Sequence, residues 1–145
     1  MAGMLAILAC CALPLLSGCQ HMASLALSDK AASVSFDDPA VLSALVSKKT
    51  EPYCLVDVRT REEYSAGHIP TAVNIPYDAI SETPPTKDKS ALIIVYCKSG
   101  RRSAQAAAAL KQLGYKRVVE FGAISRWKGP LLDSPEPGDW PATAP

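Results

Sequence analysis

The sequence predicts an α/β fold, with a small parallel sheet of about five strands flanked by helices on both faces. Apolar runs rich in β-branched residues alternate along the chain with segments of helix-forming residues, a pattern typical of parallel sheets. The clearest runs, residues 53–58 and 91–96, are almost continuously apolar, as expected of strands buried on both faces. Because such sheets bind ligands beyond the carboxyl ends of their strands, we expect the functional residues there.

The beginning of the chain indicates export. Residues 4–16 form an apolar run, shorter than the ~20 residues of a membrane-spanning helix, followed by Ser17-Gly18-Cys19. This junction resembles the lipobox of bacterial lipoproteins, which implies cleavage after Gly18 and a lipid on Cys19. We therefore expect residues 1–18 to be a lipoprotein signal peptide, with the mature protein anchored to a bacterial membrane and facing the periplasm. An ordinary signal peptide or a buried apolar helix is the alternative.

The remainder of the chain predicts a single domain with a tether and a tail. Residues 19–32 are small and polar without clear periodicity, which suits a tether between the lipid and a domain over residues 33–130. Residues 131–145 contain four prolines among polar residues and predict a flexible tail. A net charge of +1 over 145 residues argues against nucleic acid as the main partner, and we expect a monomer.

After the expected processing Cys19 carries the lipid, and Cys54 and Cys97 remain as thiols. An exported protein could form a disulfide, but these residues lie near opposite ends of their predicted strands. In parallel neighbouring strands they would be roughly 10 Å apart at ~3.3 Å per residue, beyond the ~7 Å that a disulfide allows. We expect Cys54 in the core and Cys97 as a free thiol. The His and Cys spacings suit no zinc site, so we expect no metal and no cofactor.

The first half of the domain begins with residues 33–36, whose alternation predicts a short strand. Asp38 and Pro39 then form a good helix start, and the apolar residues after them predict a helix to about Val46. After a turn, residues 53–58 form the first central strand.

The next segments are shorter. Thr60 can cap a short helix that has acidic residues in its first turn, and Gly67 ends it. Residues 72–75 predict a brief strand, and residues 78–81 a short helical piece. Residues 83–90 contain two prolines and alternating charge, which predicts a surface loop.

The second half contains the second central strand, residues 91–96. Residues 103–113 are rich in Ala, Leu, Lys and Gln and predict a helix that Gly114 ends. Residues 116–121 predict a further strand, and residues 122–128 a last short helix.

The segment between the second central strand and the long helix is the candidate active site. We call it the Cys97 loop; its residues are Cys97, Lys98, Ser99, Gly100, Arg101 and Arg102. Backbone N–H groups of a strand-to-helix loop converge on one point and the helix dipole adds positive potential, so a thiol there should ionise easily at the mouth of the strand. We expect Gly100 to let the backbone turn, and Lys98, Arg101 and Arg102 to attract an anionic substrate. A buried, inert cysteine and plain solvated basic side chains are the alternatives.

Three other polar residues lie near the same edge of the predicted sheet. Arg59 could bind substrate or pair with Asp57. Asp57 is expected to accept N–H groups of its loop rather than to act as a base. His68 stands at a turn entering a strand, which favours a structural hydrogen bond over a role as catalytic base or metal ligand.

Several of these segments together resemble the rhodanese family of sulfurtransferases. The resemblance covers roughly residues 33–130, and its segments occur in the order Leu55-Val56-Asp57-Val58-Arg59, Glu63-Tyr64, Gly67-His68-Ile69-Pro70, Ala72-Val73-Asn74-Ile75-Pro76, Tyr96 to Arg102, Leu113-Gly114-Tyr115, and Gly122 with Trp127. It implies the rhodanese fold and a thiosulfate sulfurtransferase. Cys97 would then take a sulfane sulfur from a donor such as thiosulfate, form a persulfide, and pass the sulfur to cyanide or a thiol. Thr71 and Ala123 depart from the pattern, because the family usually has Gly at both positions.

Two other functions fit part of this pattern. Cell-cycle phosphatases resemble rhodaneses but have one more residue between the cysteine and its arginine. Here four residues separate Cys97 from Arg102, which suits a single sulfur atom better than a phosphate group. The third possibility is an envelope-tethered binding module or redox sensor that carries a persulfide without turnover.

Overall fold

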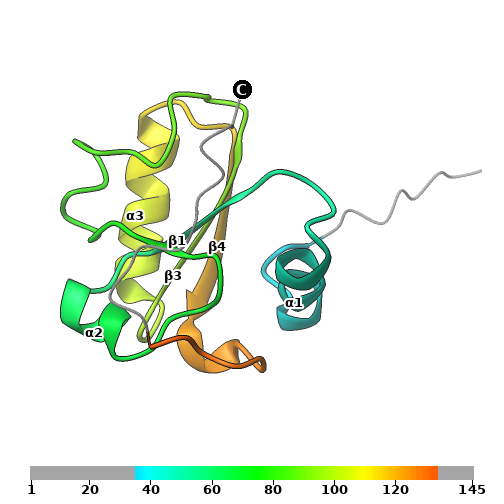
Figure 1. Ribbon diagram of the computed structural model, residues 1–145. Coiled ribbons are helices and arrows are strands. Elements are labelled where there is room, and N and C mark those ends of the chain that lie inside the picture. The colour runs from blue at the N-terminus through cyan, green and yellow to red at the C-terminus, as the bar shows by residue number, and fades with distance from the viewer. Residues whose placement is uncertain (1–34, 134–145) are drawn as a thin grey trace, which may run out of the picture. The chain divides into compact units, whose positions relative to one another are not determined.

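Residues 35–133 are the part of the chain that the computed structural model describes, and a parallel sheet runs through their centre (Figure 1). The sheet has four strands in the order β2-β1-β3-β4, all parallel. The strands are β1 (Cys54–Asp57), β2 (Val73–Asn74), β3 (Leu92–Cys97) and β4 (Arg117–Ala123). The helices are α1 (Pro39–Lys48), α2 (Arg61–Ser65), α3 (Arg101–Gln112) and the short 3-10 helix η1 (Ile124–Arg126).

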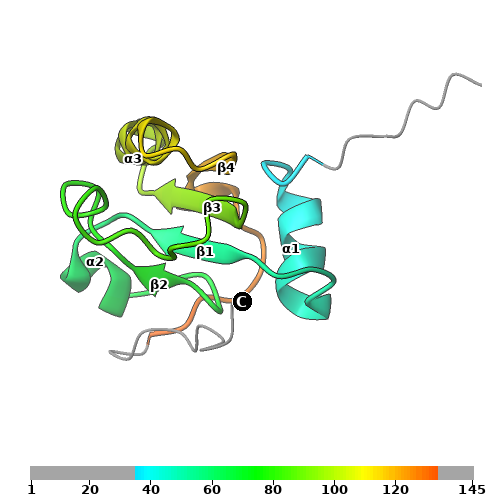
Figure 2. The ribbon, with the colours of Figure 1, turned by 90° about the horizontal axis from the view of Figure 1, so that it is seen from above.

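Helices cover both faces of the sheet, which confirms the predicted fold class (Figure 2). On one face, Leu42 and Leu45 of α1 pack with Tyr64 of α2 against Tyr96 and Phe121 of the sheet. On the other face, alanines and a leucine of α3 pack against the side chains of β1 and β3 that point the opposite way. Every residue of β1 and β3 is buried, as the continuous apolar runs predict.

Local capping explains where the helices begin and end. Asp38 accepts the N–H groups of Ala40 and Val41 and so caps α1. Thr60 and Glu63 form a reciprocal capping box at the start of α2. Gly114, with a φ angle of +90°, follows α3 as the expected stop.

Two predicted elements are wrong. The strand expected at 33–36 is not formed at its described residues: Ser35 accepts the N–H of Asp38 and its hydroxyl bonds Asp37, so this part is a turn leading into α1. The sheet therefore has four strands within the described part, not about five. Residues 78–81 form successive turns rather than a helix, closed by bonds such as Ala79 N–H to the Pro76 carbonyl.

One residue of β4 is extra relative to β3. Val95 pairs with Glu120, but the next residue, Tyr96, pairs with Gly122, so Phe121 interrupts the ladder as a β-bulge. Gly122 adopts a φ angle of +89°, which a glycine adopts without strain. The bulge places Ala123 directly beside Cys97 in the sheet.

Thr71 departs from the usual backbone of a β-branched residue. Its φ angle is +70°, in the left-handed region that favours glycine. Its hydroxyl bonds the Tyr53 hydroxyl at 2.8 Å, which partly compensates the strain. The backbone at this position gives a physical reason for glycine in the family.

Several predictions concern residues outside the described part: the signal peptide over residues 1–18, the lipid on Cys19, the tether over residues 19–32, and the tail from residue 134 onward. At the tail's expected start the structure differs from the prediction. Leu132 exchanges two backbone hydrogen bonds with His68, of 2.8 and 2.9 Å, so the chain stays attached to the domain beyond residue 130. Among residues 35–133, no helix is long and apolar enough to cross a membrane.

Candidate active site

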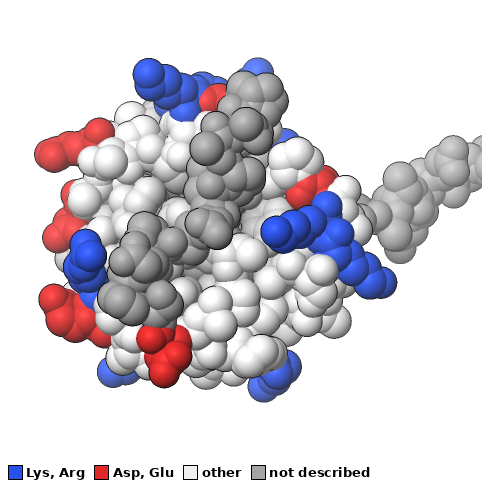
Figure 3. All heavy atoms as spheres, in the orientation of Figure 1, with Lys and Arg blue, Asp and Glu red and all other residues white. Residues whose placement is uncertain are grey.

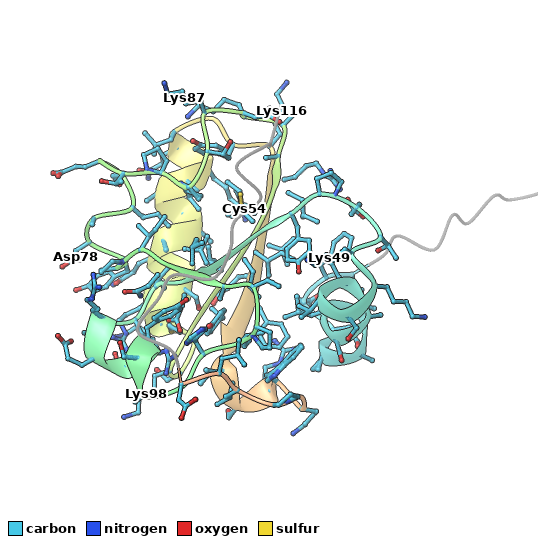
Figure 4. All side chains as sticks on the ribbon, viewed as in Figure 1. Lys49, Cys54, Asp78, Lys87, Lys98 and Lys116 are labelled. Carbon is cyan, nitrogen blue, oxygen red and sulfur yellow. The ribbon has the colours of Figure 1, made fainter. Side chains whose placement is uncertain are left out.

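Cys97 is the last residue of β3, and α3 begins four residues later. The Gly100 N–H donates to the Cys97 sulfur over 3.1 Å, and Gly100 has the positive φ angle, +99°, that this sharp turn requires. Figure 4 shows Lys98 of this loop at one end of the sheet and Cys54 near the other. The two described cysteines are both free, as expected.

The Cys97 thiol has a lowered pKa despite its burial. Burial by itself raises the pKa, but hydrogen bonds from the backbone and hydroxyl of Ser103 and from the backbone of Ser99 and Gly100 outweigh it. Burial raises the pKa of Cys54 to about 12, so that thiol stays protonated. Of the two described thiols, Cys97 is therefore the one prepared to ionise.

The Cys97 sulfur is less exposed to solvent than the sequence suggested. Cys97 has 0% of its surface exposed, whereas Lys98, Ser99 and Arg101 of the same loop are exposed. The backbone N–H groups of the loop bond the sulfur as expected, and the Cys97 side chain packs in the core cluster between the sheet and α3. A reactant reaches the sulfur only when the residues around it move.

Arg102 does not present a free guanidinium to the loop. It forms a two-pronged ion pair with Glu63, with nitrogen–oxygen distances of 2.6 and 3.0 Å. This contact lowers the pKa of Glu63 to about 2. Glu63 is also the capping-box residue of α2, so one carboxylate joins α2 to the start of α3.

Arg59 pairs with Asp57, which was one of the two expected alternatives. Its side chain donates to both oxygens of Asp57, at 2.6 to 3.0 Å, and to the carbonyl of Gly67 at 2.7 Å. Both charged side chains are nearly fully buried. Asp57 also accepts the backbone N–H of Arg59, so its structural role as a loop acceptor is confirmed.

His68 is also structural. Its Nδ1 bonds the carbonyl of Tyr64 at 3.0 Å and its ring stacks on the Tyr64 ring at 3.8 Å. Its side chain is 1% exposed. The expected structural hydrogen bond is therefore confirmed.

A small pocket of about 260 Å³ opens where the ends of β1 and α3 meet. Sequence reasoning did not identify it, because residues from three separate segments form its wall. They are Val58, Arg59, Thr60, Arg61, Pro76, Tyr77, Asp78 and Arg102. Charges of both signs are interspersed over the face in Figure 3, rather than gathered by sign.

Three residues to which the sequence analysis gave no role in the site support it. Glu63 binds Arg102, and Ser103 bonds the loop and contacts the Cys97 sulfur at 3.7 Å. The Asn74 amide donates to the backbone carbonyls of Asp57 and Arg59, both at 2.9 Å. Ser103 directly follows the loop, and this position could have suggested it, but the partners of Glu63 and Asn74 lie far away in sequence.

Known proteins resemble the chain over this same region. A family model described as a rhodanese-like domain matches residues 38–129. A sulfurtransferase of Allochromatium vinosum is 43% identical over 83 residues, covering 54% of this chain and 74% of that protein. The thiosulfate sulfurtransferase PspE of Escherichia coli is 38% identical over 71 residues, covering 48% of this chain and 68% of that protein.

A solved structure is also similar to this chain over the same region. The BH2092 protein from Bacillus halodurans superposes with a TM-score of 0.56 at 40% identity, covering 63% of this chain and 69% of that one. The matched region contains the parallel sheet and the Cys97 loop. The chain therefore belongs to the rhodanese-like domain family, and its relatives named above include sulfurtransferases.

Proposed function

We propose that the protein transfers a sulfane sulfur from a donor such as thiosulfate to cyanide or a thiol, through a persulfide on Cys97. The observation that carries this proposal is the Cys97 sulfur at the end of a parallel strand, with the Gly100 N–H aimed at it over 3.1 Å. Both the attacking thiolate and the persulfide are anions, and hydrogen bonds from backbone N–H groups stabilise such anions.

The reaction has two balanced steps. The Cys97 thiolate attacks the outer sulfur of thiosulfate, a new sulfur–sulfur bond forms, and the sulfur–sulfur bond of thiosulfate breaks to release sulfite. The acceptor then attacks the outer sulfur of the persulfide and takes it, and the bond to Cys97 breaks to regenerate the thiolate. The chain supplies the nucleophile in the first step and the leaving group in the second, and its backbone N–H groups stabilise the sulfur anion in both.

The basic residues of the site divide into two groups. Lys98 and Arg101 are exposed beside the Cys97 loop and are suited to attract a dianionic donor. Arg102 and Arg59 already bind carboxylates, so we assign them to holding the loop in shape rather than to binding the donor. This assignment changes the role expected of Arg102 and selects, for Arg59, the pairing that was one of its two expected roles.

The ion pair of Arg102 also argues against a phosphatase. A phosphatase loop needs its arginine to bind the phosphate oxygens. Here both terminal nitrogens of the guanidinium, Nη1 and Nη2, already donate to the Glu63 carboxylate. Together with the short spacing from Cys97, this contact favours transfer of a single sulfur atom.

The test is the mass of the protein after treatment with thiosulfate. We expect a gain of one sulfur atom on the peptide that contains Cys97, together with cyanide-dependent formation of thiocyanate. The Cys97→Ser variant should lose both and still fold, and the matched Cys54→Ser variant should keep both. Loss of transfer in the Cys54 variant alone would contradict the assigned nucleophile.

The alternative is a sensor that carries the persulfide without turnover. The mass gain would then appear on Cys97, but no acceptor would remove the sulfur at a useful rate. Repeated turnover in the thiocyanate assay is the result that excludes this alternative.

We also propose that the protein works at the cell envelope, anchored through lipid on Cys19. The support is the sequence Leu16-Ser17-Gly18-Cys19 after an apolar run. Incorporation of labelled palmitate in a bacterial host tests this proposal, with Cys19→Ser as the control. Palmitate labelling that persists in this variant would contradict it.

A further inference from the structure

Ser103 connects the Cys97 sulfur to a carboxylate outside the loop. Ser103 is fully buried in the first turn of α3, and its Oγ lies 3.7 Å from the sulfur. The same Oγ lies 2.7 Å from the Gly100 carbonyl oxygen and 3.2 Å from Oε1 of Glu120. Glu120 is an exposed residue of β4. A single hydroxyl therefore stands between the nucleophile and a surface carboxylate.

The hydroxyl has one proton and three neighbours that can accept it. A serine hydroxyl donates one hydrogen bond and accepts up to two. When its proton points to Gly100 and Glu120, the oxygen lone pairs face the sulfur and accept the S–H of a thiol. When Cys97 is a thiolate, the best arrangement reverses, and the hydroxyl donates to the sulfur.

We propose that Glu120 is a positioning residue that competes with the Cys97 thiolate, through Ser103, for this single proton. The negative carboxylate draws the hydroxyl proton away from the sulfur and so favours the thiol form. The backbone N–H groups of the loop act in the opposite direction. The proposal rests on the proposed function only in taking Cys97 as the nucleophile.

Position supports a direct effect of Glu120. β4 is the sheet neighbour of β3, and two successive contacts of 3.2 and 3.7 Å lead from the carboxylate to the sulfur. A methyl group placed at Gly100 would lie 4.0 Å from Oε1 of Glu120, so the carboxylate also borders the Cys97 loop. The other charged residues of the loop, of β1 and the turn after it, of α3 and of β4 are Asp57, Arg59, Lys98, Arg101, Arg102, Lys111 and Arg117, and Arg126 lies beside Gly122.

Each of these other charged side chains is either ion-paired or exposed to solvent. Arg102 is paired with Glu63, Arg59 with Asp57 and Arg117 with Glu51, and the exposed residues are Lys98, Arg101, Lys111 and Arg126. Within the described part of the chain, none of these groups forms a hydrogen bond with Ser103, whereas Glu120 accepts one from its hydroxyl.

The experiment measures how fast iodoacetamide alkylates Cys97 at a series of pH values, followed by mass spectrometry of the Cys97 peptide. Alkylation needs the thiolate but no sulfur donor, so its result is independent of sulfur transfer. We expect Glu120→Gln to lower the midpoint of the pH profile by about half to one pH unit, because a negative charge is lost and the new amide can donate to Ser103. The matched control Glu82→Gln, an exposed carboxylate in another loop, should leave the midpoint unchanged.

A second pair of variants separates the hydroxyl from a through-space charge effect. In a Ser103→Ala background, Glu120→Gln should move the midpoint by less than half of its shift in the wild-type background. An unchanged midpoint in Glu120→Gln would overturn the proposal. An equal shift with and without the Ser103 hydroxyl would overturn it as well, because the effect would then not pass through that group.

Discussion

Because of the ion pair between Glu63 and Arg102, we expect the free energy of unfolding to decrease at acidic pH. The pKa of Glu63 falls from an ordinary 4.5 to about 2, first because Arg102 donates to it, and then because of the Thr60 N–H and nearby positive charge. A shift of this size corresponds to about 3 kcal/mol. Since the carboxylate side chain is 28% exposed, solvent screening reduces the expected contribution to about 1–2 kcal/mol.

The perturbation is Glu63→Gln, which removes the charge and keeps a side chain that can complete the capping box. A lowered pKa stabilises the folded protein above the unfolded-state value, and this stability disappears as the pH falls towards the folded-state value. We therefore expect wild type to exceed the variant by about 1–2 kcal/mol at pH 7. The difference should narrow between about pH 5 and pH 2.

Urea unfolding at a series of pH values, at low salt, measures this difference. Glu62→Gln is the matched control, because Glu62 lies in the same first turn of α2 but forms no ion pair with an arginine among residues 35–133. The control should show a clearly smaller pH dependence than Glu63→Gln. A difference between wild type and Glu63→Gln that stays constant from pH 7 to pH 3 would refute the reasoning.

Substitutions at Arg59 and Thr71 test stability, and a substitution at Lys98 tests donor binding. Arg59→Met leaves a buried carboxylate without its partner and should lower the free energy of unfolding by about 3–5 kcal/mol in urea titrations; a loss below about 1 kcal/mol would show that water replaces the arginine. Thr71→Val keeps the left-handed backbone and loses the bond to the tyrosine hydroxyl, so it should cost about 1 kcal/mol. Thr71→Gly relieves strain as it loses the same bond and should be nearly neutral, and equal effects of the two variants would contradict the strain argument. Lys98→Ala should raise the half-saturating thiosulfate concentration without changing the maximal rate, and this effect should weaken at high salt.

Features encoded in neighbouring residues could be predicted from the sequence. The Thr60 cap depends on residues within one turn, and Gly114 stops α3 next to the helix itself. The carboxyl-end placement of Asp57 and Cys97 follows from two apolar strands that must lie parallel. Such local patterns were sufficient for the fold class and for the position of the thiol.

Contacts between distant segments could not be predicted in the same way. Glu63 and Arg102 are 39 positions apart, and nothing in either segment alone indicates that they meet. The short alternation at 33–36 has the same appearance in a strand and in a turn, and local hydrogen bonds of Ser35 decide between them. The complete burial of Cys97 depends on the final path of its loop, which composition does not specify.

The bulge in β4 affects where this protein can change its length during evolution. Residues 83–90 form a loop whose Lys87 lies at the opposite end of the sheet from Lys98, so insertions there would extend the surface far from the thiol (Figure 4). In β4, by contrast, two residues already stand against Tyr96, and gaining one more would change which side chain borders Cys97. Homologues should therefore vary in length in the loop that corresponds to residues 83–90. They should keep a constant number of residues in the part of β4 beside Cys97.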